Sequence, residues 1–188
     1  MNLYLLLAKQ AIENYIKEGK IISLPEDLPE EFLTRKAGTF VTIEKDGELR
    51  GCIGTYLPTK ENIAQEIICN AIAAATEDYR FGPVEEEELS SLSYTVYILS
   101  EPELVKNLKE LDPKKYGIIV KTMLITRPDG TDVVFNGHIP YKSGLLLPDL
   151  EGVDTIEKQI SIACQKGGID PTQEKILIYK FIVEKYQE

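Results

Sequence analysis

The sequence predicts an α+β fold with a mixed, largely antiparallel sheet and packed helices, on three observations. Predicted strands and helices are interspersed along the chain, most links between strands are hairpins, and two hairpins carry Asp-Gly turns, at positions 46–47 and 129–130. A length of 188 residues favours one domain over residues 1–188, with room for two lobes.

The N-terminal segment predicts an amphipathic helix over residues 3–18 that ends at Gly19. Its apolar stripe consists of Tyr4, Ala8, Ala11, Ile12, Tyr15 and Ile16. The segment around Pro25 and Pro29 then predicts a loop.

The next element is a β-hairpin that turns on an Asp-Gly pair. A regular two-residue turn would pair Ile43 with Arg50 and Val41 with Cys52. Because directly opposed residues share a face, we expect Arg50 and Cys52 to point the same way. A bulge in the return strand would change this register. The two strands are expected at residues 39–45 and 48–53.

A second helix is predicted after Thr59, the expected N-cap, and ends near residues 77–78. Its exit loop covers residues 80–83. The four consecutive glutamates at residues 85–88 predict a short helical turn with a solvated run of charge. A strand rich in β-forming residues follows at 94–99.

The C-terminal half predicts a second hairpin, a long loop, a helix and a last strand. Asp154 and Glu157 resemble a capping box at the start of the helix. The ranges are 117–126 and 131–135 for the hairpin, 136–150 for the loop, about 155–166 for the helix and 176–183 for the strand.

Charge and cysteine content argue against several classes of protein. A net charge of −10 without a Lys/Arg run gives nucleic-acid binding no support. Three cysteines without a Cys-x-x-Cys spacing argue against a disulfide framework and a zinc site, and we expect no metal or cofactor. No segment reads as a membrane span, so we expect a cytoplasmic protein with reduced thiols.

The stretch LRGCIGT is the strongest candidate for chemistry. A thiolate is a nucleophile, and Arg50 on the same face would lower the pKa of the Cys52 thiol. Gly51 and Gly54 would let a ligand approach closely, and Thr55 offers a hydroxyl and a backbone amide. The alternative is that Cys52 is a buried structural residue and that the glycines mark tight packing.

Further candidates cluster at the end of the second helix. One interpretation makes Glu77 or Asp78 an acid/base group and Arg80 an anion clamp. The other is a local ion pair in which Arg80 covers the last carbonyls of the helix. Cys164 is expected in the core and His138 on the surface of a loop.

These motifs resemble the AMMECR-type domain family, which is also found as protein A of the AmmeMemoRadiSam system. The resemblance runs through nearly the whole chain, and LRGCIGT is its most specific part. The other matching segments are residues 70–75, Asp78, Arg80-Phe81, 88–89, 143–148 and 152–155.

The resemblance implies an α+β domain with a larger and a smaller lobe, and it implies no settled reaction. Relatives are associated with a MEMO-like protein and a radical S-adenosylmethionine protein, sometimes as fusions, which implies a shared modification pathway. The radical cofactor would lie on the partner, because this chain lacks the cysteines for an iron–sulfur cluster.

Three functions stay open at this point. In the first, the chain is an enzyme or enzyme subunit in which Cys52 reacts, Arg50 binds an anionic group, and Glu77 and Arg80 complete the pocket. In the second, it is a non-catalytic binding module that presents an apolar patch at residues 145–147. In the third, the LRGCIGT motif is purely structural.

Overall fold

The computed structural model describes residues 2–123 and 141–188 and confirms the α+β class. The chain forms two compact units, and each is described by itself. Unit 1 contains residues 1–100 and 184–188, and unit 2 contains residues 101–183. Unit 2 is therefore an insertion, in sequence, before the C-terminal strand of unit 1.

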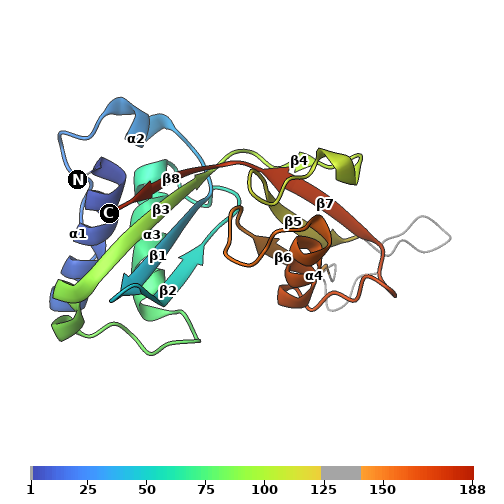
Figure 1. The fold of residues 1–188 in the computed structure, drawn as a ribbon. Coiled ribbons are helices and arrows are strands. Elements are labelled where there is room, and N and C mark those ends of the chain that lie inside the picture. Colours follow the sequence, from blue (N-terminus) through green and yellow to red (C-terminus); the bar gives the residue numbers. More distant parts are fainter. Residues whose placement is uncertain (1, 124–140) are drawn as a thin grey trace, which may run out of the picture. The chain divides into compact units, whose positions relative to one another are not determined.

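Unit 1 is a four-stranded sheet with helices packed on one face (Figure 1). The strand order is β2-β1-β3-β8, and β1 pairs antiparallel with both β2 and β3. Its elements are α1 (Leu3–Glu18), α2 (Glu30–Thr34), β1 (Thr39–Lys45), β2 (Glu48–Gly54), α3 (Ile63–Thr76), the 3₁₀ helix η1 (Glu86–Ser91), β3 (Leu92–Leu99) and β8 (Val183–Gln187).

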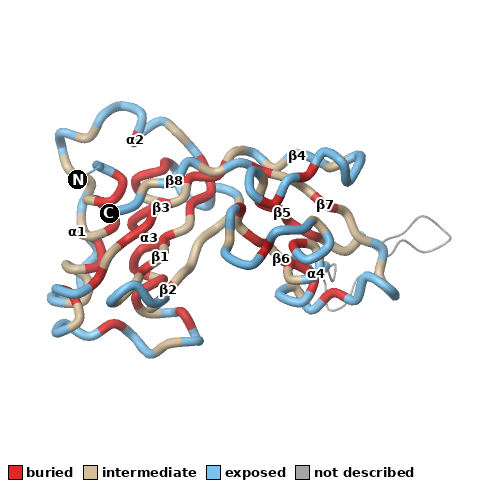
Figure 2. The backbone as a smooth tube through the Cα atoms, in the orientation of Figure 1, coloured by how far each residue is buried: buried red, intermediate tan, exposed pale blue. Residues whose placement is uncertain are grey.

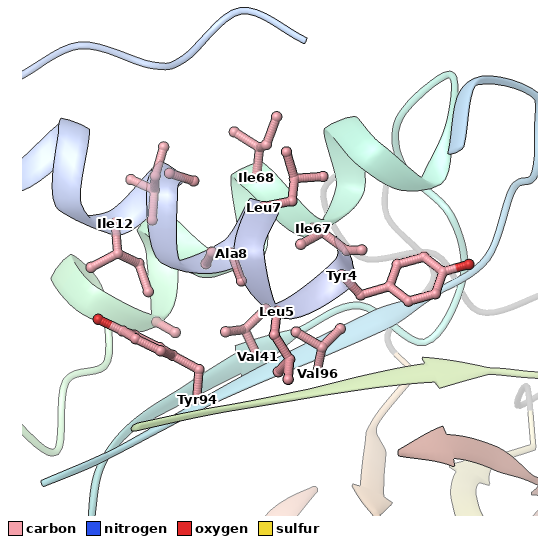
Figure 3. Packing of buried hydrophobic residues seen from close by; sticks show 14 of the residues in the cluster. Tyr4, Leu5, Leu7, Ala8, Ile12, Val41, Ile67, Ile68, Tyr94 and Val96 are labelled. Carbon is pink, nitrogen blue, oxygen red and sulfur yellow. The ribbon is translucent and has the colours of Figure 1, made fainter. Parts of the chain in front are cut away.

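The core of unit 1 lies between the sheet and the helices α1 and α3. Val41 and Val96 point from neighbouring strands toward the helices, where Leu5, Ala8 and Ile67 meet them (Figure 3). All five side chains are almost fully buried. The alternation of these residues with more exposed ones follows the two-residue period of a strand with one covered face.

Unit 2 is a smaller antiparallel sheet with one α-helix. Its strand order is β4-β7-β5-β6, and the helix packs against β5 and β6. Buried residues gather on β5 and α4 (Figure 2). The elements are β4 (Glu103–Leu104), η2 (Leu108–Glu110), β5 (Gly117–Thr122), β6 (Ser143–Leu146), α4 (Ile156–Lys166) and β7 (Ile176–Phe181).

The predicted register of the first hairpin is wrong beyond the turn. A bulge between Ile43 and Glu44 leaves Arg50 as an extra residue, so that Ile43 pairs with Gly51 and Thr42 pairs with Cys52. An extra residue on one strand shifts every later pair by one position. The bulge thus removes the reason to expect Arg50 and Cys52 on one face.

Other corrections concern where elements begin and end. The N-cap of α3 is Asn62 rather than Thr59, because the Asn62 side chain accepts from the Gln65 amide. The helix α2 was not predicted. Residues 143–146 form β6 instead of a loop. The strand predicted at 176–183 is β7 and ends at Phe181, and a further strand that was not predicted, β8, follows in the other sheet. The return strand expected at 131–135 and His138 lie outside the described residues.

Candidate functional site

Arg50 is directed toward the loop after α3. Its guanidinium donates to both carboxylate oxygens of Glu88, at 3.1 and 2.8 Å, and to the backbone carbonyls of Gly82 and Pro83, at 2.8 and 3.0 Å. Four such bonds on a side chain that is 17% exposed fix the position of the loop. In this structure the partners of Arg50 are parts of the protein itself.

Glu88 was predicted to belong to a solvated charge run, and for this residue the prediction is wrong. Its side chain is only 14% exposed and also accepts from Lys45 Nζ at 3.0 Å. Hydrogen bonds from Arg50 and from the Glu85 amide lower the pKa of Glu88 to about 2. Glu88 is therefore the anion that joins β1, β2 and η1.

The two glycines of the motif are explained by close packing. A Cβ on Gly51 would lie 2.2 Å from the Ala74 carbonyl oxygen of α3, and one on Gly54 would lie 2.2 Å from the Thr39 carbonyl oxygen. Both distances are far below van der Waals contact with rigid backbone atoms. Gly51 therefore lets β2 approach α3 closely.

The backbone of Cys52 is held by Asp78 and Arg80. The Cys52 amide donates to Asp78 Oδ2 at 2.9 Å, and Arg80 Nη2 lies 3.5 Å from the Cys52 carbonyl oxygen. The two side chains also pair with each other, at 2.9 and 2.6 Å. Hydrogen bonding from Arg80 lowers the pKa of Asp78 to about 2. This pair covers the outer edge of β2 in the way a neighbouring strand would.

The side chain of Cys52 lies on the face of the sheet opposite the helices. The Thr42 hydroxyl, across the strand pair, donates to Cys52 Sγ at 3.2 Å. The residue is half-buried and forms no disulfide. Hydrogen bonding to Asp78 raises the pKa of Arg80, and charge attraction to Cys52 acts in the same direction. A hydroxyl donor favours the thiolate form of a cysteine, whereas the charge of Arg80 is largely balanced by its partner Asp78.

Thr55 belongs to a buried polar network that sequence reasoning missed. Its hydroxyl donates to Glu66 at 2.6 Å, and Glu66 also accepts from the backbone amides of Thr59 and Lys60 at 2.7 and 2.8 Å. Glu66 is 1% exposed, and Asn70 one turn later donates to the backbone of Thr39. A glutamate inside the apolar helix sequence IAQEIIC was the available signal.

The remaining candidates are placed as follows. Glu77 is the C-cap of α3, and its side chain is exposed. Cys164 is 2% exposed in the core of unit 2, as expected. No group of three His, Cys, Asp or Glu side chains among the described residues could hold a metal ion. Within the same residues, no helix has the length and apolar character needed to cross a membrane.

Comparison with known proteins defines the class. The model of the AMMECR1 family matches residues 5–186, and the chain therefore belongs to the AMMECR1 family. A protein of Thermotoga maritima is 50% identical over 98% of this chain and 97% of its own length. A protein of Clostridium acetobutylicum is 42% identical over 98% of this chain, which spans only 36% of that relative.

The fold is shared with a solved structure. The crystal structure of an uncharacterised protein from Pyrococcus horikoshii matches 99% of this chain and 90% of its own, with 33% identity and a TM-score of 0.81. The likeness is to the whole chain, so it covers both compact units.

Proposed function

We propose that this chain is an enzyme or enzyme subunit in which Cys52 is the nucleophile. The single observation that supports it is the environment of Cys52: a half-buried thiol on the sheet face opposite the helices, with the Thr42 hydroxyl 3.2 Å from the sulfur and Arg80 Nη2 3.5 Å from the Cys52 carbonyl oxygen. In this proposal Arg50, Gly51 and Thr55 hold the hairpin and its loops in place. Their predicted contact with a ligand stays a prediction.

The chemical step follows from thiolate reactivity. The thiol loses its proton to solvent, and the sulfur electron pair forms a bond to an electrophilic carbon of the substrate. The bond from that carbon to its leaving group breaks, and the leaving group departs with the bonding pair. Arg80 would stabilise negative charge that develops next to the sulfur. Glu77 is exposed at the helix end and stays a hypothetical acid/base group.

The test is the rate at which iodoacetamide labels each cysteine in the native protein, measured by mass spectrometry. Cys52 is expected to react at least ~10-fold faster than Cys164, since Cys164 is buried and burial raises the pKa of its thiol. Cys69, which is also half-buried, is the matched control. Labelling of Cys52 no faster than Cys69 would remove the nucleophile from the proposal.

We also propose that the reaction belongs to a modification pathway shared with a MEMO-like protein and a radical S-adenosylmethionine protein. Family membership supports this, and the longer Clostridium relative has room for further domains in the same chain. The radical cofactor would lie on the partner, because three cysteines cannot supply a four-cysteine cluster site. Size-exclusion chromatography with the purified MEMO-like protein tests the association.

The burial of Leu146 argues against the alternative of a binding module at residues 145–147. Leu146 is 5% exposed and packs in the core of unit 2, so it cannot present an apolar patch. A Leu146→Asp protein would report on folding of unit 2 and not on docking.

A further inference from the structure

The outer strand of the unit 2 sheet, β6, pairs with a neighbour on one side only. It lies antiparallel to β5, and the Thr122 amide donates to the Lys142 carbonyl oxygen at 3.0 Å in the same register. In an antiparallel pair, residues that exchange hydrogen bonds alternate with residues that do not. Gly144 therefore bonds to β5, whereas the N–H and C=O groups of Ser143 and Leu145 point to the outer side of the sheet.

These outward main-chain groups have no partner within the part of the chain that the structure describes. No hydrogen bond from residues 2–123 or 141–188 reaches the main chain of Ser143 or Leu145. Ser143 is exposed and Leu145 is half-buried. A row of unpaired N–H and C=O groups on an edge strand is a template for the main chain of another strand.

The other three edge strands among the described residues have protection that β6 lacks. On β2, the Asp78 and Arg80 side chains occupy the outward amide and carbonyl groups of Cys52. The strand β8 carries two exposed charged side chains, Glu184 and Lys185, and β4 has only two residues. Charged side chains and very short strands are ways in which proteins block edge-to-edge pairing. The sequence of β6, SGLL, contains no charge.

Unit 2 also lacks the net charge that would oppose association of two copies. Residues 101–183 contain 11 Lys and Arg against 12 Asp and Glu, so this unit carries little of the net charge of −10. Net charge far from zero keeps proteins apart by repulsion. Two copies of unit 2 would therefore approach each other without the repulsion that two copies of unit 1 would meet.

We propose that β6 is an interface at which two copies of this chain pair edge to edge. A two-fold axis would place β6 antiparallel to β6 of the partner subunit, with Leu145 opposite its own counterpart. The outward N–H and C=O groups would then be satisfied, and two four-stranded sheets would become one continuous sheet. The inference is independent of the role of Cys52.

Leu145 adds an apolar contact to this main-chain pairing. A Cβ on Gly144 would meet the Ala163 carbonyl oxygen of α4, so Gly144 faces the helix and Leu145 faces the other side of the sheet. On that side the two Leu145 side chains would form a cross-strand pair. The interface is the edge of the strand and leaves Leu146 in the core of unit 2.

The first test measures the dissociation constant of the dimer by sedimentation equilibrium. Ser143→Pro removes an outward N–H that the unit 2 sheet does not use, and proline is tolerated at the first residue of a strand. Ser143→Pro should weaken the dimer at least ~10-fold, because the two-fold axis makes each substitution remove two hydrogen bonds. Ser143→Ala keeps the amide and should dimerise like the wild type.

A second pair of variants covers the case in which Ser143→Pro does not fold. Leu145→Lys places two like charges opposite each other and should also weaken the dimer at least ~10-fold. Leu145→Val keeps an apolar side chain suited to a strand and should retain the dimer. Circular dichroism establishes which of the variants are folded.

The second test follows the amides of β6 one by one, by hydrogen exchange measured with NMR. In dilute protein the amides of Gly144 and Leu146 should exchange slowly, because they bond to β5, and those of Ser143 and Leu145 should exchange fast. Above the dissociation constant of the dimer, all four amides should exchange slowly.

Three outcomes would overturn the inference. A wild-type chain that stays monomeric up to about 0.5 mM has no such interface, and the edge would then be open to a strand of a different protein. A dimer whose affinity is unchanged by folded Ser143→Pro or Leu145→Lys uses another surface. A dimer in which the Ser143 and Leu145 amides still exchange fast does not pair through β6.

Discussion

The two units of the chain use their charged residues differently. Unit 1 contains 10 Lys and Arg against 19 Asp and Glu, whereas unit 2 contains 11 against 12. The excess negative charge of unit 1 is not only on its surface. Glu66 of α3, Asp78 just after α3 and Glu88 of η1 are largely buried, and they accept hydrogen bonds from backbone amides or arginines.

The ion pairs of Lys114 in unit 2 are more exposed than the pair of Arg50 with Glu88 in unit 1. Lys114 pairs with Asp149 and Asp154, and all three side chains are more than half exposed. Exposed pairs contribute little, while partly buried pairs with extra hydrogen bonds position the groups around them. The difference indicates that Glu66, Asp78 and Glu88 hold the LRGCIGT hairpin in place. Neutralising an anion should therefore lower the stability of unit 1 more than that of unit 2.

The largest expected effect tests a feature that the two units share. Gly51→Ala in unit 1 and Gly144→Ala in unit 2 place a Cβ 2.2 and 1.8 Å from the carbonyl oxygens of Ala74 and Ala163. Each should lower the free energy of unfolding by about 3 kcal/mol, since overpacking against backbone cannot relax by side-chain movement. Urea unfolding curves provide the measurement.

Gly82→Ala is the matched control for both glycine variants, because its Cβ would meet nothing within 4 Å. If Gly51→Ala and Gly144→Ala were as stable as Gly82→Ala, the close approach of helix and strand in either unit would be contradicted.

The next largest effect is the pH dependence of the stability of unit 1. The pKa of Glu88 is lowered from 4.5 to about 2, so its contribution is complete above pH 4.5 and is lost as the pH falls toward 2. Glu88→Gln should cost on the order of 2 kcal/mol at pH 7 and progressively less below pH 4.5. Thermal unfolding between pH 7 and pH 2 measures this.

The control for Glu88 is its exposed neighbour Glu86 in the same 3₁₀ helix. Glu86→Gln should leave the pH dependence unchanged. A Glu88→Gln protein with the same pH profile as wild type would show that the anion does not tie the hairpin to the loop.

The smallest effect concerns the sulfur and should leave stability almost unchanged. Thr42→Val removes the hydroxyl that donates to Cys52 Sγ and keeps the β-branched shape. Iodoacetamide labelling of Cys52 should then need a higher pH, with a rate at pH 7 about 3- to 10-fold lower, because the thiolate loses a hydrogen bond. The pH profile of labelling measures this.

Thr42→Ser is the rescuing variant, since it restores the hydroxyl, and Thr95→Val on the neighbouring strand is the control. Equal profiles for Thr42→Val and wild type would mean that the hydroxyl does not stabilise the thiolate.

The sequence by itself determined the local elements and the family. Hydrophobic period and capping residues placed α1 and β1 at their observed bounds, because both signals depend on neighbours within one or two turns. The motif LRGCIGT was identified for the same reason: its residue types are unusual in a plain hairpin. Short segments such as α2 and β4 were missed because two to five residues carry too little periodic signal.

Only the tertiary structure decided what each motif residue does. A single extra residue at Arg50 shifted the register, turned the guanidinium toward Glu88 and paired the thiol with Thr42 instead of Val41. Residue spacing within the motif cannot reveal this, because the groups that hold Arg50 lie 32 to 38 residues further along the chain. The same holds for Glu66, whose partners come from backbone amides that any sequence supplies but only one fold brings to a buried carboxylate.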